Sequence, residues 1–182
     1  MGEKDRFFQP YPKRGEPFMN KMELLLHGWD SCYEREDWYP PLKDALNGVT
    51  WEQANWRPRY GGRINTIGET VSHLVFYKER LHLRLIGEET EYPEGVTNDD
   101  TFGAPVADEE SWKDLVNRLE KVHSAIRELL AGMDKKDFER RIPKNPIGLW
   151  VNSLILHDAY HTGQIIQLRK MQRTWPASRS FE

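Results

Sequence analysis

The stretch "WKDLVNRLEKVHSAIRELLAGM", residues 112–133, decides the fold class. Its large apolar side chains recur at steps of three and four along the whole stretch. They are Trp112, Leu115, Leu119, Val122, Ile126, Leu129 and Met133. That period places them on one face of a helix, which is typical of a helix packed in a bundle. We therefore predict a helix from about Asp108 to Met133.

Two segments nearer the N-terminus repeat this pattern. The first runs from about Phe18 to Asp37, with apolar residues at Phe18, Met22, Leu25, Trp29 and Cys32. The second begins in "TIGE", where Thr66 as N-cap and Glu69 three residues later form a capping box. Its apolar residues are Ile67, Val71, Leu74, Leu81 and Leu85. Gly87 is expected to end this helix.

The last long helix is predicted to start near "NPIG", where Asn145 can cap it and Pro146 suits the first helical position. We expect it to continue to about Arg173, because Pro176 prevents extension. The connection "WYPPLKDALNGVTWEQANWRP" (38–58) is expected to contain one or two short helical turns, and "TWEQ" within it fits a capping box. No period-2 segment of strand length is present.

The sequence therefore predicts an all-α protein, a four-helix bundle with long connections after its first and second helices. A chain of 182 residues suits a single domain over 1–182, with irregular tails at 1–17 and 175–182.

Composition and charge exclude several classes of protein. Hydrophobic residues make up 38% and charged residues 30%, as in folded globular proteins. The net charge of −3 and the dispersed Lys and Arg argue against a nucleic-acid partner, and no apolar run is long enough to span a membrane. No secretory signal is recognisable, and Cys32 is the single cysteine. We expect a cytoplasmic protein.

Two histidines stand in "LILHDAYHTG" (154–163), a stretch with the pattern of a buried helix. On a helical wheel, His157 and His161 share one face with Trp150, Leu154, Gln164 and Leu168. Two buried imidazoles need partners, which can be hydrogen-bonding groups of the core or a metal ion. His73, in the second long helix, is the best third ligand.

The other three histidines are expected elsewhere. His27 falls off the apolar stripe of its helix, and His123 lies beside Val122 near the rim of the third long helix. Both are predicted to be surface residues. His82 sits near the C-terminal end of its helix, where a cation is favoured by the helix dipole.

These residues carry a family resemblance. The segments "TIGETVSHLVFYKERL" and "LILHDAYHTGQIIQLRK" resemble the second and fourth helices of the DinB/YfiT-like superfamily, and "VTWEQANWRP" is more weakly similar to the segment before helix two. The resemblance implies a four-helix bundle in which His73, His157 and His161 bind one divalent metal ion per chain, zinc or nickel in the first place.

Neighbouring polar residues are candidates for orienting the ligands. Glu69 lies one turn before His73, although its capping role already accounts for it. Asp158 could accept a hydrogen bond from an imidazole N–H, or face solvent or another subunit. Gln164 could reach a substrate or metal-bound water. Gly163 is expected to allow close helix approach, and Tyr160 to lie in the core.

Three protein ligands leave one coordination position open, as in catalytic zinc sites. The catalytic group would then be a metal-bound water or thiolate. The resemblance implies a transferase that joins a low-molecular-weight thiol to an electrophile, and the absence of an evident general base agrees with it. The alternatives are a metal-dependent hydrolase and a non-catalytic, metal-stabilised stress-response binding module.

Three further expectations complete this interpretation. Cys32 lies on an apolar stripe and is expected to serve packing rather than nucleophilic attack. The acidic connection 88–107 is expected to cover the entrance to the site. Apolar faces on the first and third long helices suggest a homodimer.

Overall fold

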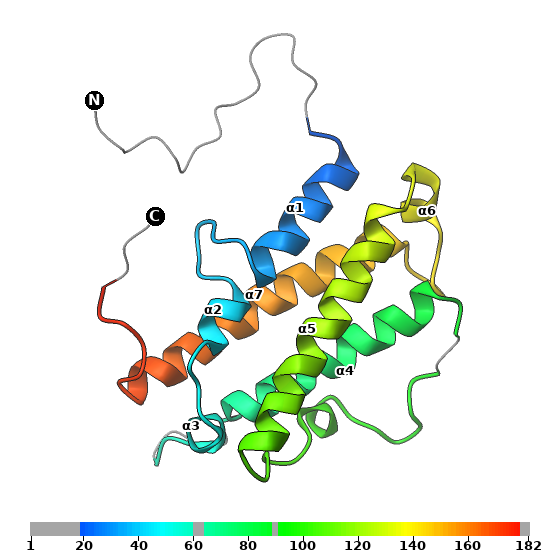
Figure 1. Ribbon diagram of the computed structural model, residues 1–182. Coiled ribbons are helices and arrows are strands. Elements are labelled where there is room, and N and C mark those ends of the chain that lie inside the picture. Colours follow the sequence, from blue (N-terminus) through cyan, green and yellow to red (C-terminus); the bar gives the residue numbers. More distant parts are fainter. Residues whose placement is uncertain (1–18, 60–63, 89–90, 179–182) are drawn as a thin grey trace, which may run out of the picture.

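The computed structural model describes residues 19–59, 64–88 and 91–178, and most of them are helical. Four long helices form the body of the protein: α1 (Lys21–Tyr33), α4 (Ile67–Leu85), α5 (Glu109–Ala131) and α7 (Ile147–Met171) (Figure 1). Short helices occupy the connections: α2 (Leu42–Leu46), α3 (Trp51–Asn55), the 3₁₀ helix η1 (Asp99–Phe102) and α6 (Lys135–Glu139). Within these ranges the β structure is limited to one isolated bridge between Arg141 and Pro146. The all-α prediction is confirmed.

The starts of three helices follow local sequence signals. Thr66 caps α4 through the predicted capping box, in which its hydroxyl accepts from the Glu69 N–H and the Glu69 carboxylate accepts from the Thr66 N–H. Thr50 forms the predicted capping box of α3 with Gln53, and Asp108 caps α5. Gly87 follows α4 with a φ of 85°, a left-handed conformation that glycine adopts without steric cost.

The ends of α1 and α7 differ from the prediction. Helix α1 starts after Asn20, which caps it, and ends at Tyr33, four residues before the predicted end; Phe18 lies outside the described residues. Pro146, rather than Asn145, is the N-cap of α7, and the Asn145 carbonyl accepts a hydrogen bond from the Ile142 N–H at 2.9 Å. The proline thus begins the helix by its fixed φ without a side-chain cap.

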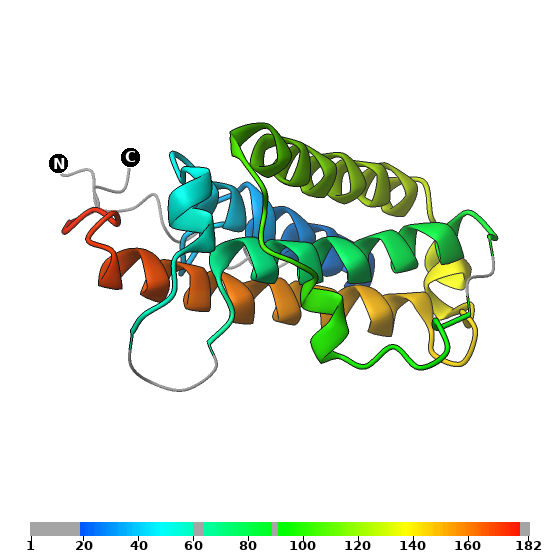
Figure 2. The same cartoon turned by 90° about the horizontal axis from the view of Figure 1, so that it is seen from below.

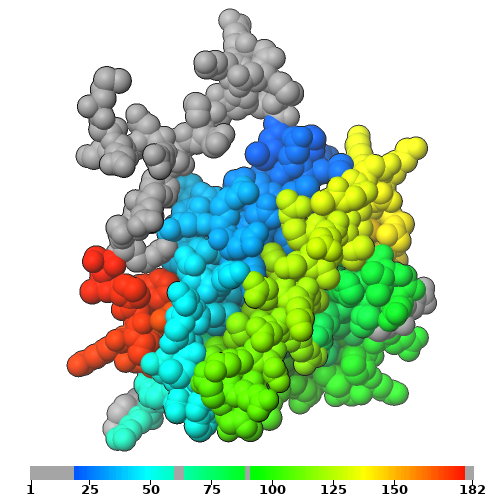
Figure 3. Space-filling model, in the orientation of Figure 1, coloured from blue at the N-terminus to red at the C-terminus, as the bar shows by residue number. Residues whose placement is uncertain are grey.

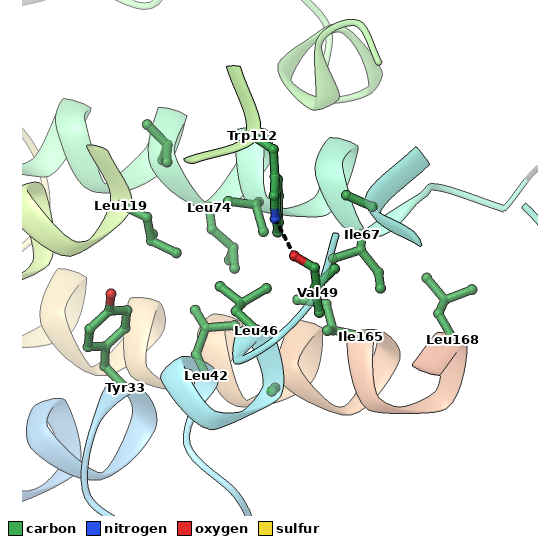
Figure 4. Packing of buried hydrophobic residues seen from close by; sticks show 14 of the residues in the cluster. Tyr33, Leu42, Leu46, Val49, Ile67, Leu74, Trp112, Leu119, Ile165 and Leu168 are labelled. Atoms are coloured by element: carbon green, nitrogen blue, oxygen red, sulfur yellow. Dashed lines mark hydrogen bonds between the residues drawn. The ribbon is translucent and has the colours of Figure 1, made fainter. Parts of the chain in front are cut away.

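Packing divides the core into two apolar clusters along the bundle. One joins α4, α5 and α7 to the short helices α2 and α3, and Trp112 anchors it by donating its indole N–H to the Val49 carbonyl at 2.7 Å (Figure 4). The other joins α1, α4, α5 and α7 around Trp29 and Ile126. The space-filling view shows α5 packed beside the α2–α3 segment on one face of the molecule (Figure 3).

The surface of α7 carries large exposed apolar side chains. Leu149, Leu156 and Tyr160 are each more than half exposed. By contrast, Trp112 and Ile126 on α5 are buried within the chain, so α5 does not offer the apolar face on which the homodimer was predicted. The prediction that Tyr160 lies in the core is wrong.

Candidate metal centre

Helices α4 and α7 lie side by side and bring three histidines together (Figure 2). His73 lies two turns into α4 and is 2% exposed, whereas His157 and His161 lie in the middle of α7. The Nε2 atom of His157 is 2.9 Å from Nε2 of His73 and 3.1 Å from Nε2 of His161. Three ring nitrogens from three side chains therefore converge on one point.

Hydrogen bonds on the far side of two rings fix which nitrogen carries the proton. Nδ1 of His73 is 2.6 Å from the Thr101 hydroxyl, which itself donates to the Asn98 carbonyl at 2.6 Å. Because that hydroxyl has only one hydrogen, it accepts from the Nδ1–H of His73. The Gln164 side-chain oxygen likewise accepts from Nδ1–H of His161 at 2.7 Å.

Both assignments leave a lone pair on Nε2 of His73 and of His161, aimed at His157. His157 can donate one Nε2 proton, which satisfies one of its two close contacts. In the other contact, two nitrogen lone pairs face each other and repel. A cation at the centre would accept all three lone pairs and remove this repulsion.

Burial keeps the three imidazoles neutral. It lowers the pKa of His73 to about 3 and of His157 to about 4, and the neighbouring histidines add to both shifts. Burial also lowers the pKa of His161, although its bond to Gln164 and the nearby Asp158 carboxylate oppose the shift. Neutral imidazoles are the form that binds metals.

The donor set fits a divalent transition-metal ion. Three imidazole nitrogens suit zinc, nickel, copper or iron, and tetrahedral zinc would hold neighbouring nitrogens roughly 3.3 Å apart. The contacts of 2.9 and 3.1 Å are close to that spacing. His73, His157 and His161 are thus positioned so that they could hold one ion.

Aromatic rings surround the histidines. Phe102 stacks on His73 with a centroid distance of 4.0 Å and an interplanar angle of 9°. The Tyr77 ring makes interplanar angles of 74° and 81° with the rings of His73 and His157, and the Tyr160 ring centroid lies 5.0 Å from that of His161. Phe102 belongs to η1, which lies within the acidic connection after α4 and packs against α4. The described part of this connection therefore contacts the site directly (Figure 2).

The three polar neighbours of the ligands have different positions. Gln164 forms a hydrogen bond to His161, one of the three candidate metal ligands. Glu69 is committed to the cap of α4 and to an ion pair with Arg57. Asp158 points into the bundle, where it pairs with Lys78, and among the described residues it makes no hydrogen bond to an imidazole. Trp150, on the same predicted face of α7, packs against the apolar cluster around Trp29.

Lys78 and Asp158 are the centre of a second polar cluster, the ion-pair cluster, which also contains Cys32 and His123. Lys78 Nζ lies 2.7 Å from Asp158 Oδ2, and both side chains are 0% exposed. The ammonium also donates to Nδ1 of His123 at 3.2 Å and lies 4.2 Å from the centroid of the Trp29 ring. Helices α1, α4, α5 and α7 each contribute a residue.

His123 is not a surface residue, and that prediction is wrong. It is 3% exposed and lies between the rings of Trp29 and Tyr33, with centroid distances of 4.7 and 4.2 Å. Burial, with the positive charges of Lys78 and Arg127, lowers its pKa below the ordinary value.

Cys32 is fully buried, as expected from its apolar stripe. Burial raises the pKa of its thiol well above the usual value, and the Asp158 carboxylate, 3.5 Å from Sγ, adds to the shift. A thiol held protonated in the core is a poor nucleophile.

Comparison with known proteins identifies the family. The family model of the DinB superfamily matches residues 41–165, a range that includes all three histidines. Neither the curated proteins nor the solved structures include a match to this chain. Among the described helices, none is long and apolar enough to cross a membrane. Because the match spans more than half of its residues, the chain belongs to the DinB superfamily.

Proposed function

We propose that this protein is a metal-dependent transferase that joins a low-molecular-weight thiol to an electrophile. His73, His157 and His161 would hold one divalent ion, zinc or nickel, with one coordination position left for substrate. A divalent ion at this site would keep a thiol substrate ionised and therefore nucleophilic at neutral pH.

The observation that supports this proposal most is that the nearby carboxylates already bind other groups of the protein. A hydrolase would usually need a general base close to the ion. Glu69 is held by its helix cap and by Arg57, and Asp158 is paired with Lys78 inside the bundle. A thiol that has already lost its proton needs no such base, so these residues favour thiol transfer over hydrolysis.

The chain's own residues would prepare the site and exclude water from part of it. Thr101 and Gln164 hold the rings of His73 and His161 with their lone pairs inward. Phe102 covers one face of His73, and Tyr77 and Tyr160 border the other rings. In the reaction the thiolate sulfur would form a bond to the electrophilic carbon, the leaving group would depart with its electron pair, and the thiol proton would pass to solvent.

The test combines metal-loaded protein with bacillithiol, mycothiol or glutathione and an activated aryl chloride. We expect wild type and Cys32→Ala to consume the thiol above background, and His161→Ala to lose this activity. Circular dichroism would verify that both variants are folded. Hydrolysis of an ester or amide panel without thiol consumption would favour the hydrolase. If neither occurs, a non-catalytic binding module becomes the better account.

We also propose that the chain forms a homodimer, through α1, as its sequence suggests, and through α7 rather than α5. Leu24 on α1 and Leu149 and Leu156 on α7 are large apolar residues exposed on the subunit. Burying them against a second copy would remove apolar area from water. Sedimentation at micromolar protein should give a dimer mass, and a monomer mass would contradict this proposal.

A further inference from the structure

A groove lies beside the three histidines, between the start of α4 and the C-terminal half of α7. Its volume is about 510 Å³, and its lining includes Asn65, Tyr160, Gly163, Gln164, Gln167 and Met171. Small-molecule sites in proteins commonly measure roughly 300–1,000 Å³. The α4–α7 groove, as we call it, is therefore large enough for a small ligand.

Among the described residues, the lining of the α4–α7 groove carries no carboxylate, ammonium or guanidinium group, although 30% of the chain is charged. Its polar groups are mainly the side-chain amides of Asn65, Gln164 and Gln167. Amides both donate and accept hydrogen bonds, so they suit neutral carbonyl, amide or hydroxyl groups. A charged ligand would lose water there without gaining an opposite charge.

Gly163 keeps the groove open. A Cβ atom added at this position would meet nothing within 4 Å. The prediction that Gly163 allows close helix approach is therefore wrong. A glycine inside a helix costs about 1 kcal/mol relative to alanine. The glycine at this position leaves space for a ligand in the groove.

Gln164 joins the groove to the histidines. Its side-chain oxygen accepts from His161, whereas its amide NH₂ makes no hydrogen bond to the described residues. That NH₂ can donate to a ligand carbonyl. Tyr160, 64% exposed and 5.0 Å from the His161 ring, offers a flat apolar surface beside it.

We infer that the α4–α7 groove binds an uncharged ligand whose apolar or aromatic part packs on Tyr160 and whose carbonyl oxygen accepts from Gln164. Gln164 then has two roles, orienting a metal ligand with its oxygen and binding the ligand with its nitrogen. The inference rests on the proposed function in one respect: the bound ligand is the electrophile only if the metal site presents a thiolate.

The test measures binding without turnover. Benzamide, benzoate and benzylammonium have similar sizes and differ in charge, and ligand-observed NMR would give their affinities for metal-loaded protein. We expect benzamide to bind at least tenfold more tightly than either ion. Gly163→Leu, which fills the groove, should weaken benzamide at least tenfold, whereas Ser153→Leu, at an exposed position of α7 outside the groove, should not.

A further variant separates the two roles of Gln164. Gln164→Glu keeps an acceptor for His161 but removes the donor and adds a negative charge to the groove. We expect it to retain its metal and to bind benzamide at least tenfold more weakly.

Equal binding of the three probes, binding of none, or benzamide binding unchanged by Gly163→Leu would overturn the inference. If wild type binds no probe and Gly163→Leu dissociates a dimer, the inference is also overturned. The groove would then be part of the interface with a second copy. These binding measurements contain no thiol, so a negative result does not contradict the proposed thiol transfer. A negative result in the thiol assay likewise does not contradict ligand binding in the groove.

Discussion

Two polar clusters lie next to each other between α4 and α7, and they differ in how their charges and lone pairs are satisfied. The histidine cluster consists of His73, His157 and His161, and the ion-pair cluster is built around Lys78 and Asp158. Asp158 directly follows His157 in the sequence, so one turn of α7 contributes to both clusters.

The two central charges of the ion-pair cluster neutralise each other, although Oδ1 of Asp158 has no hydrogen-bond partner among the described residues. The ammonium and the carboxylate lie 2.7 Å apart with no exposure to solvent. The histidine cluster has partners for the outer nitrogens of His73 and His161, but its three inner nitrogens have only one another. The ion-pair cluster therefore neutralises its own charges, whereas the inner nitrogens of the histidine cluster are positioned so that they could bind a cation.

The largest expected effect comes from breaking the ion pair. Lys78→Met leaves the Asp158 carboxylate buried and unpaired, because the described residues offer it no other cation. Removing one partner of a buried pair costs about 3–5 kcal/mol. Urea denaturation of metal-free protein should show a loss of this size in the free energy of unfolding.

Two controls sharpen this prediction. Lys78→Met combined with Asp158→Leu removes both charges and should recover most of the lost stability. Lys43→Met breaks the exposed pair with Glu120, in which both side chains are about half exposed, and should cost about 0–1 kcal/mol. Equal losses for Lys78→Met and Lys43→Met would contradict the structural role of the ion-pair cluster.

A smaller effect is expected from the residues that orient the histidines. Thr101→Val and Gln164→Ala each remove the acceptor that fixes an imidazole ring. Removing such a partner typically weakens metal binding about 10–100-fold. Competition with a chelator would measure the affinity. Gln167→Ala, on the same face of α7 but without a bond to a histidine, is the matched control; an equal effect there would refute the orienting role.

A further expected effect concerns the dependence of stability on pH. The pKa of His73 in the folded, metal-free protein is about 3 and that of His157 about 4, below the value of about 6.5 expected in the unfolded chain. Lowered folded pKa values mean that the unfolded chain binds protons first as pH falls. Their contribution to stability is therefore full above pH about 6.5 and is lost progressively toward pH about 4.

Urea denaturation of metal-free protein at several pH values would measure this dependence. His157→Asn should reduce the slope between those two pH values, because one titrating imidazole is removed. An identical slope in wild type and His157→Asn would show that His157 is not held neutral by the fold.

Features governed by local chemistry could be predicted from the sequence. Thr66 and Gly87 mark the start and end of α4 because capping and left-handed φ depend on nearby backbone. The pairing of His157 with His161 follows from the helical period. His73 was predicted as the third ligand from the expected positions of the other histidines and from the family resemblance, since no local signal relates α4 to α7.

Features that depend on contacts between distant segments could not be predicted. Thr101 and Phe102 reach His73 from a connection without periodicity. Asp158 and His123 are polar residues at buried positions, so the apolar pattern gave no sign of them. They become compatible with the core only because Lys78, on a third helix, lies between them.

The most direct test of the central claim is metal analysis of protein purified without an affinity tag. Wild type should contain about one divalent ion per chain, or take up one zinc or nickel ion on titration. His157→Ala combined with His161→Ala should contain almost none while its circular dichroism remains helical. The matched control replaces His27 and His82, which are partly exposed and lie outside the cluster, and should keep its metal. Full metal occupancy in the His157→Ala, His161→Ala variant, or no uptake by wild type, would contradict the account.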